Sequence, residues 1–74
     1  MENVVSHLDV VGLEDREIEI VRGLSNGKRP KILMAEIELS NRTIEAIIDS
    51  LKAKFNCNTR EQLVATFIRN KIIE

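Results

Sequence analysis

The chain has 74 residues, which is enough for one small domain but too few for a large hydrophobic core. Its 43% hydrophobic and 31% charged residues indicate a folded soluble domain, and its two Phe with no Trp or Tyr exclude the aromatic platforms on which single-stranded bases stack. The net charge is -1, but the charges are unevenly distributed along the chain. Residues 1–27 carry six acids and two bases, whereas residues 28–72 carry nine bases and five acids.

The first predicted helix follows a short arm. Residues 1–12 show apolar pairs without a helical stripe, and we interpret them as an N-terminal arm or linker remnant before a domain at residues 13–74. Between Leu13 and Asn26, apolar residues recur at steps of three, which predicts a helix. Acids crowd its first turn, where they favour the helix dipole, and Gly27 after Asn26 is typical of a left-handed helix end.

A short second helix is predicted from Pro30 to near Leu39. Proline suits the first turn of a helix, because its missing N–H would have no partner there. We expect Leu33, Met34 and Ile37 to form the buried stripe. Only a Leu–Ser–Asn turn separates this segment from the next helix, which is the tight connection of a helix-turn-helix.

The third predicted helix has the cleanest amphipathic pattern in the chain. Ser40 is a good N-cap, and the helix is expected to stop at Asn56, which tolerates a left-handed conformation. Its apolar positions are Ile44, Ile47, Ile48, Leu51 and Phe55. A fourth helix is predicted after Thr59, in a capping box with Gln62, and its expected buried residues are Leu63, Val64, Phe67 and Ile68. The predicted fold is therefore all-α, with four helices and no strands.

No arrangement of residues suggests catalysis. His7 has no second metal ligand nearby, and we give it no role. Cys57 is the single cysteine, and it best fits a small apolar gap in a protein of a reducing compartment. The chain has no glycine loop to cradle phosphates and no apolar run long enough to cross a membrane. We expect a cytoplasmic protein that is not an enzyme and that uses no metal, cofactor or membrane.

Three stretches carry a resemblance to a known family. LxxREIEIVRGLSNGK, LSNRTIEAIIDSLKAKF and NCNTREQLVA resemble, over residues 13 to about 72, the LuxR-type (GerE-type) helix-turn-helix domain of bacterial transcription factors. The matching positions are Leu13, Arg16, Glu17, Glu19, Ile20, Gly27, Lys31, Leu33, Ile37, Leu39, Ser40, Thr43, Ile44, Leu51, Lys54, Phe55, Thr59, Arg60, Gln62, Leu63 and Val64. The sequence departs from the family pattern where Glu14 replaces Thr, Met34 replaces Ala and Ile47 replaces His.

This resemblance implies a sequence-specific regulator that binds double-stranded DNA as a homodimer, with the third helix in the major groove. The residues expected to anchor phosphates are Lys28, Arg29, Lys31, Ser40, Arg42, Thr43, Lys52, Lys54 and Arg60. Base contacts are expected from Glu45, Ala46 and Asp49, and the fourth helix is expected to dimerise through exposed Thr66, Arg69 and Asn70. The chain is either a stand-alone regulator or an effector domain, whose further partners would be an upstream receiver or sensory domain, or RNA polymerase.

Two acids, Glu45 and Asp49, stand where basic or other base-contacting residues are usual in the family. Three explanations remain open. Either carboxylate accepts a hydrogen bond from cytosine N4, which gives roughly 1–3 kcal/mol of discrimination per good contact. Alternatively, the acids pair along the helix, Glu45 with Arg42 and Asp49 with Lys52, for about 0.2–0.5 kcal/mol each. In the third explanation, the face of the helix that carries these acids no longer binds DNA and instead binds a protein partner with a basic surface.

Overall fold

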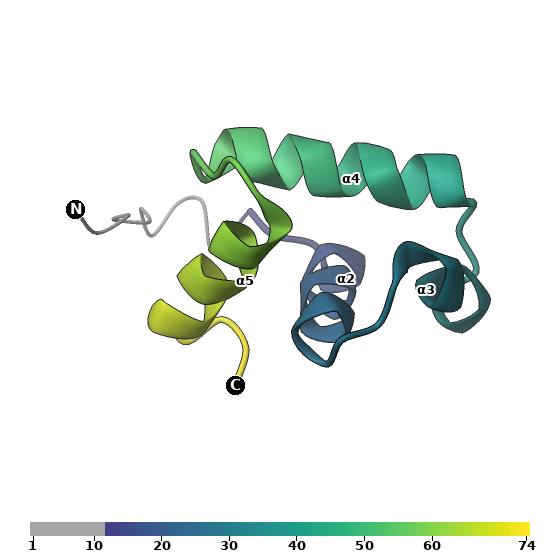
Figure 1. The fold of residues 1–74 in the computed structure, drawn as a ribbon, viewed down its shortest axis with the longest axis horizontal. Coiled ribbons are helices and arrows are strands. Elements are labelled where there is room, and N and C mark those ends of the chain that lie inside the picture. The colour runs from purple at the N-terminus through teal and green to yellow at the C-terminus, as the bar shows by residue number, and fades with distance from the viewer. Residues whose placement is uncertain (1–11) are drawn as a thin grey trace.

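The computed structural model describes residues 12–74, so the arm predicted for residues 1–12 lies outside the described residues except for Gly12. The described part consists of four α-helices, with no strand: α2 (Asp15–Ser25), α3 (Pro30–Ile37), α4 (Asn41–Lys54) and α5 (Arg60–Arg69). Figure 1 shows α4, the longest of them, with α2, α3 and α5 arranged along one of its sides. The predicted all-α class and the order of the four helices are confirmed.

Side chains cap the starts of the last two helices. The Ser40 hydroxyl accepts the Thr43 N–H at 3.1 Å, as the sequence predicted. At α5, the Thr59 hydroxyl accepts the Gln62 N–H at 3.1 Å. In a capping box, the Gln62 side chain would accept the N–H of the cap residue, Thr59. In the structure its amide oxygen accepts the N–H of Asn58, one residue earlier, at 2.6 Å. These bonds satisfy N–H groups that have no partner inside the helix.

Left-handed residues end the helices. Gly27 and Asn56, both expected in this role, have φ of 81° and 55°. The next N–H then bonds back to a carbonyl of the helix, from Lys28 to Gly23 at 3.0 Å and from Cys57 to Lys52 at 2.7 Å. The second helix was expected to end near Leu39, and α3 ends one residue before its cap, Glu38. The sequence did not predict the left-handed conformation of Glu38, whose φ is 61°, because this position has no glycine or asparagine to mark it.

The core consists of two clusters, and α4 contributes to both. One cluster holds Val21, Leu51, Phe55, Cys57, Leu63, Phe67 and Ile73, and the other holds Ile20, Leu33, Ile44 and Ile48. Ile47 is partly buried and packs against both. One prediction for α5 was wrong: Ile68 is 44% exposed, whereas Thr66 takes the buried position.

Helices α2 and α3 approach closely at Gly23. A Cβ atom at this position would lie 2.4 Å from the Leu33 Cδ2 atom, which is too close for a non-bonded contact. Leu33 is itself 1% exposed, so its side chain has little room to move. The absence of a side chain at Gly23 therefore allows α3 to pack closely against α2.

Replacing Glu38 by glycine is expected to stabilise the domain by about 0.5–1 kcal/mol, because glycine adopts a positive φ without the steric cost of a Cβ atom. Urea unfolding followed by circular dichroism measures the change. Glu38→Ala is the matched control, since it removes the same carboxylate but keeps a Cβ. Equal stabilities of the two variants would contradict the steric explanation.

Candidate nucleic-acid interface

The outer side of α4 presents an open line of residues. Arg42, Ala46, Asp49 and Ala53 are all exposed, whereas the isoleucines and leucine that α4 contributes to the core point the other way. Successive residues of an α-helix turn by about 100°, which separates these two sets. Ala46 and Asp49 were predicted to contact bases and Arg42 to anchor a phosphate, and the structure leaves all three accessible.

An arginine from another helix holds Glu45. At the start of α5, the Arg60 guanidinium donates a short hydrogen bond from Nη2 to the Oε1 atom of Glu45. Intrahelical pairing had suggested Arg42 as the partner of Glu45, but the structure supplies Arg60, which is 15 residues further along the chain. The carboxylate of Glu45 and one of the expected phosphate ligands are therefore bound to each other.

Asp49 is the more open of the two carboxylates. Its Oδ1 atom lies 3.4 Å from Lys52 Nζ, the neighbour expected from the spacing of three residues. The Asp49 side chain is 74% exposed, compared with 41% for Glu45. Most of the Asp49 side chain is therefore accessible to a ligand that lies along α4. The Glu45 carboxylate is less accessible, and it is already paired with Arg60.

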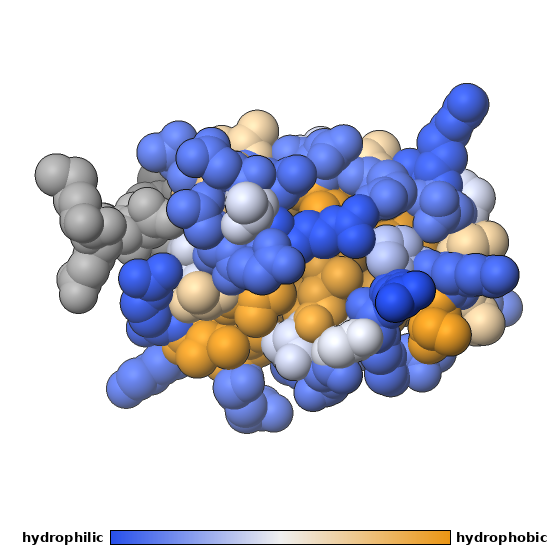
Figure 2. All heavy atoms as spheres, in the orientation of Figure 1, coloured by the Kyte–Doolittle hydropathy of each residue, from blue (hydrophilic) through white to orange (hydrophobic). Residues whose placement is uncertain are grey.

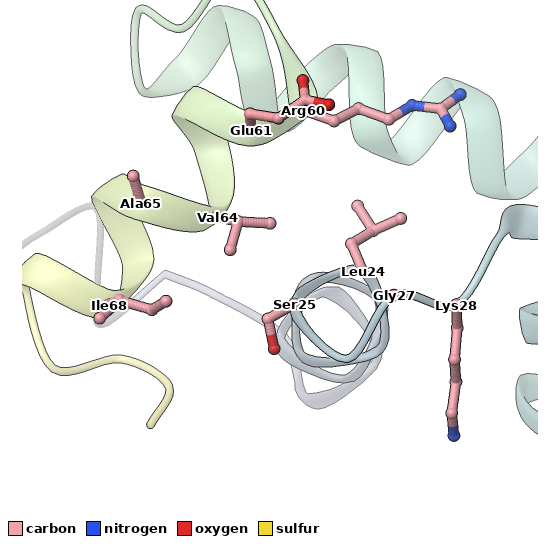
Figure 3. Close-up of a pocket in the computed structure, with 9 residues that line it drawn as sticks. All are labelled: Leu24, Ser25, Gly27, Lys28, Arg60, Glu61, Val64, Ala65 and Ile68. Carbon is pink, nitrogen blue, oxygen red and sulfur yellow. The ribbon is translucent and has the colours of Figure 1, made fainter.

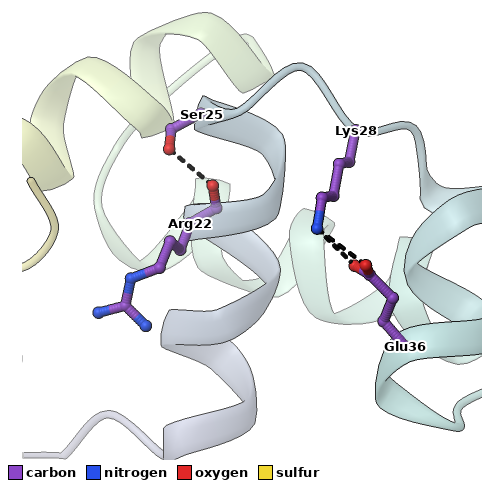
Figure 4. Close-up of polar contacts among 4 residues, drawn as sticks. All are labelled: Arg22, Ser25, Lys28 and Glu36. Atoms are coloured by element: carbon purple, nitrogen blue, oxygen red, sulfur yellow. Dashed lines mark hydrogen bonds and ion pairs between the residues drawn. The ribbon is translucent and has the colours of Figure 1, made fainter.

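Lys28 is also engaged within the protein. Its Nζ atom donates hydrogen bonds to both carboxylate oxygens of Glu36 at 2.8 Å, which joins the loop before α3 to the side of that helix (Figure 4). The same view shows the Ser25 hydroxyl donating to the Arg22 carbonyl at 2.6 Å, near the end of α2. In this loop, the charge available to a ligand is therefore carried by exposed Arg29 and by Lys31 at the start of α3.

Other predicted phosphate ligands lie at the two ends of α4. The hydroxyls of Ser40 and Thr43 are 2.9 Å apart at its start, beside exposed Arg42. At its end, Lys54 is exposed, and its Nζ atom lies 5.8 Å from the centroid of the Phe55 ring. The predicted ligands of α4 thus lie along that helix, with Arg60 of α5 beside it. Lys28 lies apart from them, beside α3.

The residues expected at a dimer interface differ in exposure. Thr66 is fully buried, so its predicted exposure was wrong: it faces the core, and its hydroxyl oxygen lies 3.5 Å from Cys57 Sγ. Arg69 is exposed at the end of α5. Asn70 is partly buried, and its side-chain amide donates to the Thr66 carbonyl at 2.8 Å.

A groove runs between α5 and the C-terminal end of α2. Leu24, Val64, Ala65 and Ile68 give it apolar walls, as the close-up in Figure 3 shows. Figure 2 shows hydrophobic side chains reaching the surface on this side of the molecule. The exposed apolar surface of α5 is therefore centred on Ile68, a residue that the sequence had placed in the core.

Arg16 is a neighbour of α4 that the sequence did not reveal. It lines a shallow hollow together with Arg42, Ala46 and Ser50 of α4. Arg16 was noted only as a position shared with a known family, because nothing in the order of residues shows which helix lies beside it.

Within residues 12–74, no group of three or more His, Cys, Asp or Glu side chains is placed to hold a metal ion. The helices in this part of the chain are also too short or too polar to span a lipid bilayer.

A comparison with protein families gives one match. Residues 11–67 match the family described as bacterial regulatory proteins, luxR family. The match spans α2, α3, α4 and most of α5, so it contains both helices of the helix-turn-helix. No curated protein and no solved structure matches the chain significantly.

Proposed function

This chain belongs to the LuxR family of bacterial regulatory proteins, and we propose that it regulates transcription by binding double-stranded DNA with α4 in the major groove. The observation that carries the proposal is the outer side of α4, where Arg42, Ala46 and Asp49 remain exposed while the opposite side is buried. An α-helix with its side chains is about 10–12 Å across and fits a major groove about 12 Å wide. Residues on this outer side would then meet the edges of the bases.

Phosphate anchoring would come from cations and hydroxyls around the turn between α3 and α4 and from lysines in the last turn of α4. The proposed ligands are Arg29, Lys31, Ser40, Arg42, Thr43, Lys52 and Lys54. Lys28, Lys52 and Arg60 contribute less than their charge suggests, because each already pairs with a carboxylate. Phosphate contacts of this kind fix the register of the protein on DNA without reading its sequence.

Base readout would fall mainly to Asp49 and Ala46. A carboxylate accepts a hydrogen bond from the N4 amino group of cytosine, and a small apolar side chain contacts the methyl group of thymine. Asp49 suits the first role because it is 74% exposed. Glu45 is paired with Arg60. It would therefore affect the local charge next to Asp49 and Ala46 without contacting a base.

Fluorescence anisotropy of a random duplex titrated with the protein tests DNA binding. We expect binding that weakens steeply with salt, with a slope of log K against log salt of roughly −3 to −5 for a few phosphate contacts per domain. Absence of binding at low salt would contradict the proposal. It would favour the alternative in which the fold is retained and the acidic outer side of α4 binds a protein partner.

The two carboxylates are expected to behave differently when each is truncated to alanine. Asp49→Ala should weaken the preference for one or two base pairs by roughly 1–3 kcal/mol in total, because a base contact is lost. Glu45→Ala should keep the preference and raise the affinity for all duplexes, because Arg60 is then released from its ion pair. Affinities for a duplex selected by the protein, and for its single-base variants, measure both effects. If only Glu45→Ala changed the base preference, Glu45 and not Asp49 would be the residue that contacts a base.

We also propose that α5 forms a homodimer interface through Ile68, with Arg69 and Asn70 at its edge. Ile68→Lys is expected to abolish the dimer, because a charge would replace an apolar contact at the centre of the interface. Sedimentation velocity at high protein concentration, with and without a two-part DNA site, gives the oligomeric state. Ile32→Lys on α3 is the matched control, since Ile32 is likewise exposed, at 52%. Loss of the dimer in both variants, or in neither, would contradict an interface on α5.

The setting of this activity is proposed from the family. A DNA-binding regulator of bacteria would act in the cytoplasm, where the chromosome lies. Its activity would be controlled by an upstream receiver or sensory domain, or exerted through contact with RNA polymerase. Copurification of RNA polymerase with the protein from bacterial cells would support the second of these routes.

A further inference from the structure

The hollow beside α4 combines groups from two helices. Arg16 of α2 and Arg42, Thr43 and Ser50 of α4 line it, together with the small side chain of Ala46. Two arginines and two hydroxyl-bearing residues thus contribute to the walls of one recess at the edge of the proposed DNA-reading side. Guanidinium groups donate paired hydrogen bonds to phosphate oxygens, and hydroxyls donate single ones.

The Arg16 guanidinium is accessible to a ligand. Its nearest ion-pair contact is with Glu14, where Nη2 and Oε1 lie 3.7 Å apart and both side chains are more than half exposed. Such an exposed pair contributes little and is readily exchanged for a phosphate. Glu17 also lines the hollow, and its charge opposes an anion. Its carboxylate accepts the Glu14 N–H at 2.8 Å, which holds it at the start of α2.

The hollow lies on one flank of the exposed line of α4 residues. At about 100° per residue, Thr43 and Ser50 lie to one side of the exposed line through Ala46, whereas Glu45 lies to the other. A helix that fills the major groove has a phosphate backbone along each of its flanks. Arg60 stands at the Glu45 flank, and Arg16 stands at the opposite flank.

We infer that Arg16 and Arg42 form a binding site for one backbone phosphate of double-stranded DNA. The inference rests on the proposed function and adds to it a contact from α2, outside the helix-turn-helix. Arg16 would fix the angle at which α4 lies in the groove, because it bridges the body of the domain to the DNA backbone. It would contribute to affinity for every sequence and leave base preference unchanged.

Arg16→Gln tests the inference, with Arg22→Gln as the matched control. Arg22 is on the same helix and also pairs with a nearby glutamate, Glu19, but it does not line the hollow. Anisotropy titrations of a duplex between 50 and 200 mM salt give the affinity and its salt slope. Losing one phosphate contact should reduce the magnitude of the slope by about 0.9, so the fall in affinity over this range becomes about three- to fourfold smaller. Arg16→Lys should retain most of the slope, since a lysine still pairs with phosphate as a point charge.

Each outcome has a distinct meaning. A reduced slope for Arg16→Gln, with a wild-type slope for Arg22→Gln and a largely restored slope for Arg16→Lys, supports the phosphate site. Equal behaviour of the two glutamine variants, while the wild-type protein binds DNA, overturns the site and leaves the proposed function standing. Failure of the wild-type protein to bind any duplex at low salt overturns both. Circular dichroism spectra of all variants verify that each is folded.

Discussion

One apolar stripe on α4 joins the two halves of the core, and the exposed side of the molecule depends on it. Ile44 and Ile48 pack with α2 and α3, whereas Leu51 and Phe55 pack with α2, α5 and the C-terminal residues. Ile47 contacts both clusters. Because side chains of a helix have fixed directions, burying this stripe along the whole of α4 forces the opposite side into solvent. The same packing that stabilises the fold therefore presents the proposed reading surface.

The charges on that surface are arranged by partners inside the protein. The Phe55 and Phe67 rings meet edge to face with centroids 5.2 Å apart, which joins the end of α4 to α5. The ion pair between Glu45 and Arg60 joins the same two helices. Exposed ion pairs contribute little to the stability of the fold. The main consequence of this pair is that the charge of Arg60 offsets the negative charge of Glu45 on the surface of α4. A carboxylate that is already matched by a guanidinium repels a phosphate backbone less than an isolated one would.

The proposed interface draws on segments that are far apart in the chain. The outer side of α4 supplies the reading residues, the start of α5 supplies Arg60, and the start of α2 supplies Arg16. This arrangement explains how a chain with a net charge of -1 could present the proposed DNA-binding surface. Glu45 and Asp49 are each paired with a cation, and in the proposed complex the remaining cations would face the DNA backbone.

The sequence by itself determined the features that depend on near neighbours. The four helices, the caps at Ser40 and Thr59 and the left-handed end at Asn56 follow from spacings of a few residues, and so does the membership of the family. Only the tertiary structure decided the partner of Glu45, the burial of Thr66 in place of Ile68, and the position of Arg16 beside α4. Helix periodicity fixes which residues share a side of a helix, but the rotation of that helix against its neighbours comes from packing. Contacts between side chains distant in the sequence therefore exist only once all four helices are assembled.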